Sequence, residues 1–208
     1  MLQVLLMLIN FIGSFNSGKT TLAAKLFAAL KESNLTCEFI PEQARFYIAE
    51  KRITNKLNNI VLNNIDQLNI LIKQFEAEKL MLNSCDRDTI IITDSSIYNS
   101  LLYMDDDFIE KFADNTLIDI TNYYDKYNPD NIMTFICDPV INTYSNTPDK
   151  NRIHTQEHTD KINNRLDKLF GYYKIPRLSG DIKSRFNTSY LNIIDKLNDL
   201  KIIQNDYR

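Results

Sequence analysis

The sequence predicts an α/β fold in three layers, with helices on both faces of a five-stranded parallel sheet. Short apolar runs of strand length alternate along the chain with longer segments whose apolar residues recur at helical spacing. The first run, residues 4–9, is apolar throughout, as expected for a central parallel strand that is covered on both faces. It is followed by a glycine-containing turn and then by a helical pattern. Strands that alternate with helices in this way favour a parallel sheet.

The next elements follow the same alternation. Residues 18–31 are expected to form a helix, because Leu22, Leu26 and Leu30 fall on one side. A short strand over residues 36–40 should end at the following proline. The helical region that comes next should be broken near residues 54–59. Its second half places these apolar residues on one face: Ile65, Leu68, Leu71, Ile72, Phe75 and Leu82.

The rest of the chain supplies three more strands. The pattern predicts a third strand over residues 89–93 and a fourth over residues 132–136. A fifth strand near residues 172–178 contains Pro176, which suits an edge position. Helices are expected between and after these strands, at residues 108–127, 159–173 and 181–200.

Length and charge limit the class of protein. The 208 residues show no internal repeat and no linker, which predicts one domain over residues 1–208. Twenty-four basic against 27 acidic residues give a net charge of -3, which argues against a nucleic-acid partner but leaves one open. No segment reaches the ~20 apolar residues of a membrane span, so no membrane partner is expected. Apolar faces on the helix over residues 60–82 would support a homodimer.

The three cysteines are far apart and show no metal-binding or disulfide spacing. We interpret Cys37, Cys85 and Cys137 as small buried hydrophobic residues rather than nucleophiles. A reducing, cytoplasmic location fits this pattern.

Residues 13–20 match the phosphate-binding pattern G-x-x-x-x-G-K-[ST] in full, directly after a strand and before a helix. Glycines allow the backbone to approach phosphate oxygens, and the start of the helix adds a positive dipole. Lys19 would contact the β- and γ-phosphates of ATP, and the Thr20 hydroxyl would bind Mg²⁺. The expected nucleotide-binding residues are Gly13, Ser14, Asn16, Ser17, Gly18, Lys19, Thr20 and Thr21.

Asp94 follows the third strand, where a carboxylate can hold Mg²⁺ or accept a proton from an acceptor hydroxyl. Ser95 comes next, so the pair of acids typical of water-activating ATPases is missing. The base-reading motif of GTPases is missing too, since no lysine accompanies Asn128 and Asp130.

Glu42 and Arg45 follow the second strand, three residues apart at the start of a helix. This spacing puts a carboxylate and a guanidinium on one face, at the edge where α/β sheets bind ligands. Glu42 could bind or deprotonate an acceptor, and Arg45 could orient it. An ordinary surface pair would show the same spacing.

The polar segment after the fourth strand, about residues 139–165, could be a lid whose cations neutralise charge during phosphoryl transfer. Arg152 is the preferred candidate within it, ahead of Arg165. A solvated loop with scattered charge is the alternative.

Together these motifs resemble the nucleoside and nucleotide kinase branch of P-loop proteins. They are most similar to the ribosylnicotinamide kinase domain of NadR-type proteins and its AAA-type P-loop relatives. The resemblance rests on residues 13–21, 42–48, 91–94, 149–152 and 173–176, and on Gln74. It implies transfer of the γ-phosphate of ATP, with Mg²⁺, to a hydroxyl of a nucleoside-like small molecule. It places Glu42 and Asp94 around the acceptor and metal, and Gln74 near the substrate.

Several alternatives remain open. A deoxynucleoside kinase, a thymidylate-like nucleotide kinase or a kinase of modified nucleobases in DNA would share most of these motifs. In thymidylate and deoxynucleoside kinases an acid–arginine pair usually follows the third strand. Ser95 stands at that place in this sequence, which weakens the thymidylate kinase hypothesis more than the ribosylnicotinamide one. A non-catalytic NTP-binding or switch module is the alternative from a different class.

Overall fold

A computed structural model describes residues 6–56, 60–124, 129–139 and 156–200 of the chain. Its strands are β1 (Met7–Ile12), β2 (Cys37–Ile40), β3 (Ile90–Thr93), β4 (Ile132–Cys137) and β5 (Arg177–Leu178). The longer helices are α1 (Lys19–Glu32), α2 (Gln43–Asn55), α3 (Asn64–Ser84), α5 (Asp114–Tyr124), α6 (Gln156–Phe170) and α7 (Ile182–Asp199). Shorter turns of helix are η1 (Ile97–Tyr103), α4 (Asp106–Phe108), η2 (Ile109–Ala113) and η3 (Pro129–Asn131).

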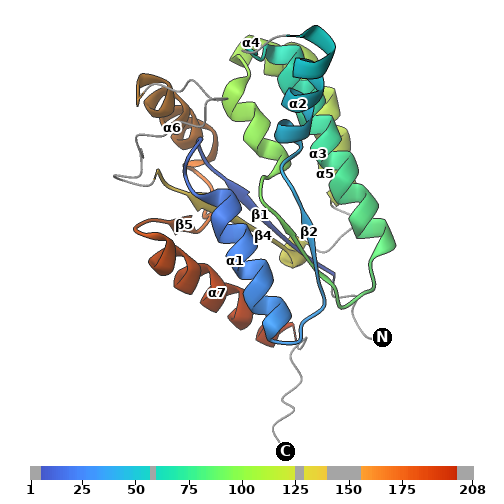
Figure 1. Ribbon diagram of the computed structural model, residues 1–208, viewed down its shortest axis with the longest axis vertical. Coiled ribbons are helices and arrows are strands. Elements are labelled where there is room, and N and C mark those ends of the chain that lie inside the picture. The colour runs from blue at the N-terminus through green and yellow to red at the C-terminus, as the bar shows by residue number, and fades with distance from the viewer. Residues whose placement is uncertain (1–5, 57–59, 125–128, 140–155, 201–208) are drawn as a thin grey trace, which may run out of the picture.

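The five strands form one parallel sheet in the order β2-β3-β1-β4-β5 (Figure 1). The register pairs Ile40 with Thr93 and Ile12 with Ile136, so the strands end at one common edge. The loops that follow β1, β2, β3 and β4 therefore lie near one another. This edge is the place where open α/β sheets bind ligands.

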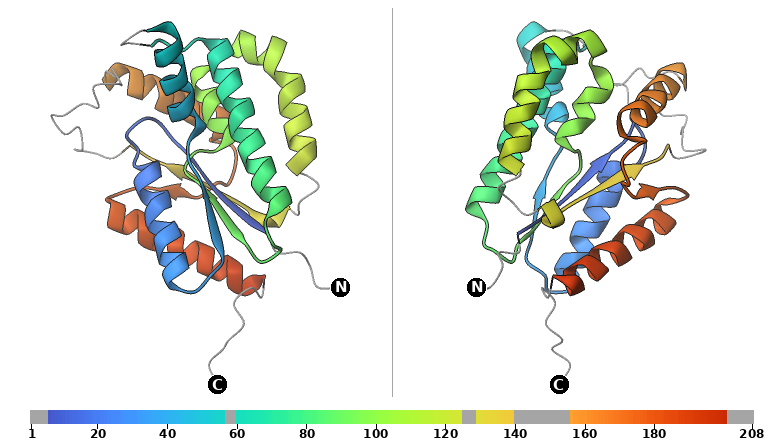
Figure 2. Two further views of the ribbon diagram at one scale, coloured as in Figure 1. Left: turned by 45° about the vertical axis from the view of Figure 1, so that its right-hand side comes forward. Right: turned by 180° about the vertical axis from the view of Figure 1, so that it is seen from behind.

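Helices cover both faces of the sheet. Helices α1 and α7 lie side by side on one face, and α3, α5 and α6 lie on the other (Figure 2). Helix α2 packs against α3 beyond the ends of the strands. The predicted three-layer α/β class and the edge position of the fifth strand are both confirmed.

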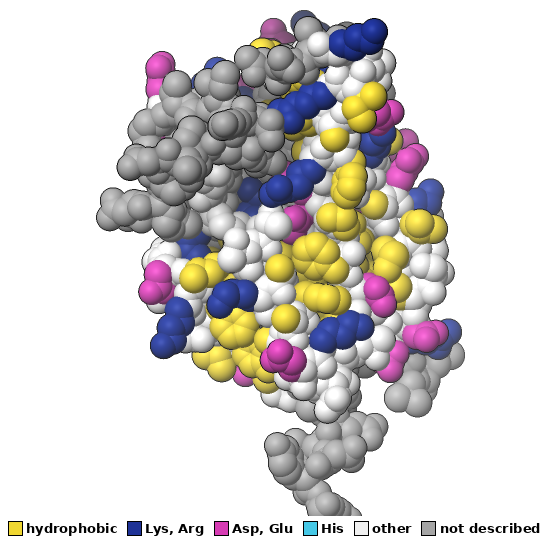
Figure 3. All heavy atoms as spheres, viewed as in Figure 1, with side chains coloured by type: hydrophobic (Ala, Val, Ile, Leu, Met, Phe, Trp, Pro, Cys, Tyr) yellow, Lys and Arg dark blue, Asp and Glu magenta, His cyan; other side chains and the backbone are white. Residues whose placement is uncertain are grey.

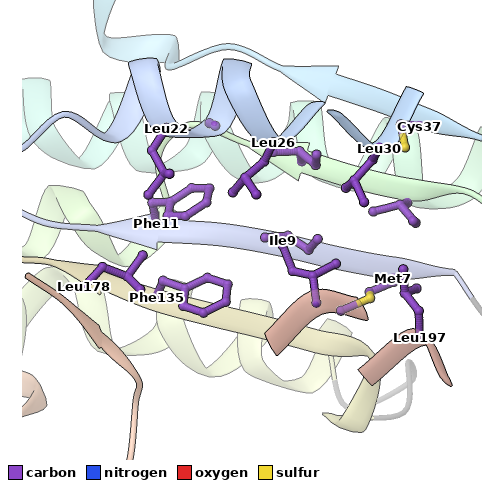
Figure 4. Close-up of a cluster of buried hydrophobic side chains, with 14 of the residues drawn as sticks. Met7, Ile9, Phe11, Leu22, Leu26, Leu30, Cys37, Phe135, Leu178 and Leu197 are labelled. Atoms are coloured by element: carbon purple, nitrogen blue, oxygen red, sulfur yellow. The ribbon is translucent and has the colours of Figure 1, made fainter. Parts of the chain in front are cut away.

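Successive side chains of the central strand β1 point to opposite faces of the sheet and pack into two different hydrophobic cores. Met7, Ile9 and Phe11 point toward α1 and α7 and are fully buried, while Leu8 faces the core under α3. Figure 4 shows the first core, where Leu22, Leu26 and Leu30 of α1 and Leu197 of α7 close over the sheet. The predicted spacing of leucines along α1 is thus the packing face of that helix.

Three predicted boundaries need correction. β1 runs on through Asn10 to Ile12, because the sheet pairing with β4 extends that far. β5 contains only Arg177 and Leu178, because only these residues and the carbonyl of Pro176 reach the end of β4. The helix expected from residue 108 begins at Asp106 and passes through a π-helical turn, η2, before α5.

The prediction for the buried face of α3 was wrong in part. Ile65 is 61% exposed, whereas Asp66, Gln67, Gln74 and Glu78 are buried. Leu71 and Leu82 are buried as expected. The helix buries polar side chains because this face supports a polar network described below, which apolar periodicity cannot reveal.

β2 forms one edge of the sheet. Figure 3 shows hydrophobic side chains gathered over this edge, between α1 and α3. Here the rings of Phe27 and Phe39 meet edge to face with centroids 5.6 Å apart, and Lys31 lies over Phe27. An aromatic contact of this kind covers part of an edge strand that would otherwise be open to pairing.

All three cysteines are free thiols. Burial raises the pKa of Cys37 and that of Cys137 to about 11, which keeps both thiols protonated. The prediction that these two are buried hydrophobic residues is confirmed, while Cys85 is only half-buried. Among the described helices, none combines the length and the apolarity needed to cross a membrane.

The α1 core generates a stability prediction. Leu26→Ala should lower the free energy of unfolding by about 2–5 kcal/mol, because it leaves a cavity in a fully buried site. Leu80→Ala removes the same atoms from a side chain that is 67% exposed and should change stability by no more than about 0.5 kcal/mol. Urea unfolding followed by circular dichroism compares the two. Equal effects would show that the packing of α1 is misassigned.

Candidate nucleotide and acceptor site

The loop over residues 13–18 joins β1 to α1 and requires two glycines. A Cβ atom on Gly13 would lie 2.6 Å from the carbonyl oxygen of Cys137 and 2.8 Å from Oγ of Ser17. Gly18 has a φ of 80°, and Asn16 has a φ of 57°, both in the left-handed region. The loop therefore packs tightly against β4 and turns back to start α1.

The lysine of the loop is folded over it. Nζ of Lys19 donates to the carbonyl oxygens of Gly13 and Ser14, at 2.9 Å each, and the residue is only 8% exposed. Thr20 and Thr21 follow at the N-terminal end of α1, where free backbone N–H groups favour an anion. The loop thus concentrates positive charge where a phosphate chain would lie.

Two residues outside the motif hold the loop in place, and neither was expected from the sequence. Oδ1 of Asn99 in η1 accepts a hydrogen bond from the Gly13 amide at 3.0 Å. Arg185 in α7 is 1% exposed and donates to the carbonyl oxygens of Ser17 and Asp138, at 2.7 Å each.

Arg185 also donates to the carbonyl oxygens of Gly180 at 2.8 Å and Pro139 at 3.2 Å. It therefore joins the phosphate loop, the end of β4 and the loop before α7. Within the described chain, its hydrogen bonds all go to carbonyl oxygens and no carboxylate pairs with it. A buried guanidinium next to the phosphate loop thus adds a positive charge that a bound anion can offset. One weak signal existed in the sequence, because Arg185 lies on the apolar face of α7.

The acids and the arginine predicted from the strand ends come together. Glu42 and Arg45 form an ion pair with Oε2 and Nε 3.3 Å apart, and Arg45 also donates to Oγ1 of Thr20 at 3.2 Å. Asp94 is buried beside them, at 2% exposure. Burial, and then the nearby charge of Glu42, raise the pKa of Asp94, against the lowering effects of Thr20, Arg45 and Lys19.

Oδ1 of Asp94 is buried and has no hydrogen-bond partner among the residues that the structure describes. An acceptor atom left in this way costs free energy unless a ligand uses it. A carboxylate oxygen and a threonine hydroxyl next to a phosphate loop are the hard oxygen ligands that Mg²⁺ prefers. Thr20 and Asp94 therefore fit a Mg²⁺ ion that is bound together with a nucleotide.

Two hollows meet at this edge of the sheet. The larger, about 1010 Å³, is lined by residues 15–21, Glu42 and Arg45, and by residues 138–139 and 179–182. The smaller, about 360 Å³, lies between α2, α3, η1 and α6 and is lined by Ser95, Asn99 and Tyr103 among others. Phe15 and Glu42 line both. The arrangement provides a phosphate side and a second, more enclosed side that share one wall.

Gln74 lines the smaller hollow, but its amide is already engaged. Its Oε1 accepts from the Gln43 amide at 3.1 Å, and its Nε2 donates to Thr93 Oγ1 at 2.8 Å and to Glu78 Oε1 at 3.1 Å. Its expected contact with substrate stays a prediction. The same hollow is also lined by Arg165, which pairs with Asp106 at 2.8 Å.

The structure thus gathers residues 13–21, Glu42, Arg45 and Asp94 at one site. Arg152 and most of the expected lid lie outside the described residues. Asn99 and Arg185 are the two loop-supporting residues that the sequence did not single out, and each lies far along the chain from the motif that it contacts.

Comparison with known proteins agrees with this geometry. Residues 8–185 match a family model described as an AAA domain, and the chain belongs to this family of P-loop proteins. A solved structure of NadR in complex with NAD and AMP-PNP is similar, with a TM-score of 0.61 and 16% identity. A second NadR structure, in complex with NR, has a TM-score of 0.58 and 15% identity.

The NadR likeness covers 98% and 96% of this chain but 52% and 51% of the NadR chains, so this chain spans about half their length. No curated protein sequence matches the chain. At this level of identity the likeness shows a shared fold, and the predicted membership of the P-loop proteins is confirmed by the family match.

The role of Arg185 is testable by stability. Arg185→Met should lower the free energy of unfolding by at least about 3 kcal/mol, because several charge-assisted hydrogen bonds to buried carbonyls are lost together. Arg185→Lys should be intermediate, since one ammonium group cannot reach all the carbonyls. Arg87→Met, at an exposed position, is the matched control. Denaturant unfolding measures all three, and wild-type stability in Arg185→Met would contradict this account.

Proposed function

We propose that the protein is a kinase that transfers the γ-phosphate of ATP, with Mg²⁺, to a hydroxyl of a nucleoside-like small molecule. The observation that carries the proposal is the meeting of the two hollows at Phe15 and Glu42. A phosphate loop faces one hollow, and a carboxylate shared by both marks the boundary where a phosphoryl group would pass. A protein that only hydrolyses or senses a nucleotide does not need the second hollow.

On the donor side, the loop amides and Lys19 would hold the β- and γ-phosphates. Lys19 now donates to the carbonyls of Gly13 and Ser14, so its ammonium group is already inside the loop. Bound Mg²⁺ would be held by Thr20 and Asp94 and would supply charge neutralisation for the phosphates. Arg45 bonds Thr20 and lies within the same hollow, so it would add a further positive charge.

On the acceptor side, Glu42 or Asp94 would accept the hydroxyl proton. Burial raises the pKa of Asp94, so once ionised it is a stronger base than an ordinary aspartate. Glu42 is held by Arg45 and faces both hollows, so it would bind or orient the hydroxyl. We include Arg152 in the proposal as the cation of a lid over about residues 139–165, within one domain spanning residues 1–208.

Ribosylnicotinamide is the favoured acceptor. The support comes from the motif resemblance to the ribosylnicotinamide kinase domain and from the likeness in fold to NadR. A nucleotide acceptor is the second candidate, because Lys161 and Arg165 of α6 also line the smaller hollow and could receive an anionic group. A deoxynucleoside, or a modified nucleobase in DNA, would use the same donor side.

A panel assay tests the proposal directly. The protein is incubated with Mg·ATP and ribosylnicotinamide, nucleosides, nucleotides or a modified-base oligonucleotide, and the products are weighed by mass spectrometry. We expect one small acceptor to gain a single phosphoryl group while ADP forms in equal amount. Nucleotide binding without transfer to any acceptor would favour a switch module and overturn the kinase proposal.

Lys19 supplies the matched test of the donor side. Lys19→Ala should lower transfer by about 100-fold or more, because one preorganised positive contact to the transferring group is lost. Lys25→Ala removes an exposed lysine from the same helix and should leave transfer unchanged. Circular dichroism checks that both variants keep the fold. Retained activity in Lys19→Ala would show that the phosphate site is misplaced.

A further inference from the structure

Gln74 lies at the centre of a buried polar network that the donor chemistry does not use. Its carboxamide makes three hydrogen bonds to three different elements: Gln43 at the start of α2, Thr93 at the end of β3, and Glu78 one turn along α3. Gln74 is 3% exposed and Glu78 is 1% exposed. These hydrogen bonds use both N–H donors and the oxygen of the buried carboxamide and hold it in one orientation.

Each contact touches a residue next to a proposed reactive group. The Gln43 amide belongs to the peptide unit that follows Glu42, and Thr93 immediately precedes Asp94. Thr93 in turn donates to the carbonyl of Ser95, at 2.9 Å, so the turn after β3 is also tied in. The amide of Gln74 is thus a link between the backbone that carries Glu42 and the backbone that carries Asp94.

Glu78 fixes which way that amide points. Its Oε1 accepts from Gln74 Nε2 at 3.1 Å, and its Oε2 accepts from the hydroxyl of Tyr124 in α5. Both neighbours donate, so an ionised carboxylate suits the position. The Glu78 carboxylate holds the NH₂ group of Gln74 toward α3, so the Gln74 oxygen points toward the Gln43 amide and accepts from it.

We propose that Gln74, oriented by Glu78, is a positioning residue that sets the separation of Glu42 and Asp94 beside the acceptor hollow. The inference rests on the proposed kinase function for its catalytic consequence. Its structural part, the link from Gln74 to α2 and β3, is independent of which acceptor is used. In this role Gln74 acts through the two carboxylates, separately from its predicted contact with substrate.

The network also predicts a pH dependence. Burial, opposed by the hydrogen bonds of Tyr124 and Gln74, raises the pKa of Glu78 from 4.5 to about 7. The hydroxyl of Tyr124, whose own pKa is raised by burial and by Glu78, faces it from α5, with Tyr98 and Tyr123 beyond. Above pH 7 the carboxylate accepts both hydrogen bonds. Below pH 7 the proton on Glu78 weakens its hold on Gln74, so the linked arrangement should loosen as pH falls.

The linkage to stability has the opposite sign. Because the pKa is raised on folding, the folded protein binds the proton more tightly than the unfolded chain between about pH 4.5 and 7. The contribution of Glu78 to stability therefore falls as pH rises through that window. Glu78→Gln should remove this dependence, so its stability relative to wild type should increase between pH 5 and pH 8 in denaturant unfolding.

The structural part is tested by NMR on the intact chain without any ligand. In wild type, the Gln43 amide proton should shift with a midpoint near pH 7, and Glu78→Gln should abolish that titration. Gln74→Met keeps the side-chain volume but removes all three hydrogen bonds. The chemical shift of the Gln43 amide proton should then move upfield, as expected for an amide that has lost its hydrogen-bond acceptor. Glu76→Gln makes the same chemical change as Glu78→Gln on an exposed position of α3 and should leave the titration intact. If the chemical shift of the Gln43 amide proton changes neither in Gln74→Met nor with pH, the proposal is overturned.

The catalytic part is tested with whichever acceptor the panel assay identifies. Gln74→Met should lower kcat/KM for the acceptor at least tenfold while KM for Mg·ATP changes less than twofold. Gln74→Glu alone keeps an acceptor for Gln43 but sets two carboxylates against each other, and adding Glu78→Gln lets residue 78 donate to residue 74, so the reciprocal pair should recover part of the loss that Gln74→Glu causes. A rise in KM for Mg·ATP with acceptor kcat/KM intact would overturn the positioning role. Should wild type phosphorylate nothing, the kinase proposal fails, and the NMR result alone decides whether the Gln74 link exists.

Discussion

The buried guanidinium of Arg185 is the contact on which the rest of the site depends. It bonds carbonyl oxygens of the phosphate loop, of the end of β4 and of the loop before α7. A carbonyl at the base of a tight loop cannot bond within a helix or a sheet, so an external donor has to satisfy it. One residue of the last helix thereby holds a loop near the beginning of the chain. The same side chain also places a buried positive charge beside the phosphate loop.

The parallel sheet turns that anchored loop into a site. Because parallel strands end at a common edge, the residues that follow β1, β2 and β3 meet although they are far apart in the sequence. The polar face of α3 completes the arrangement, since Gln74 joins the start of α2 to the end of β3. Burying Gln74 and Glu78 is costly unless their hydrogen bonds are made, and here they are made to Gln43, Thr93 and Tyr124.

Much of the fold could be predicted from local sequence patterns. The apolar strand runs, the spacing of the α1 leucines and the complete phosphate-binding motif each depend on neighbouring residues, so the elements could be predicted within a few positions. The Glu42–Arg45 pair was also predictable, because three residues on a helix bring two side chains to one face. The buried face of α3 was predicted only in part, since apolar periodicity placed Ile65 on that face and gave no sign that Gln74 and Glu78 are buried. The burial of Gln74 depends on partners in α2 and β3 that lie 31 and 19 residues away.

The sequence by itself determined the α/β class, the position of the phosphate loop and the residue types available for phosphate and metal binding. These follow from short-range sterics, helix periodicity and the need of a tight loop for glycine. Only the tertiary structure decided that Arg185 and Asn99 hold the loop, that Asp94 is buried with one oxygen free of protein partners among the described residues, and that a second hollow shares a wall with the first. The physical reason is that burial and hydrogen-bond partners depend on which distant segments pack together, and no local pattern encodes that pairing.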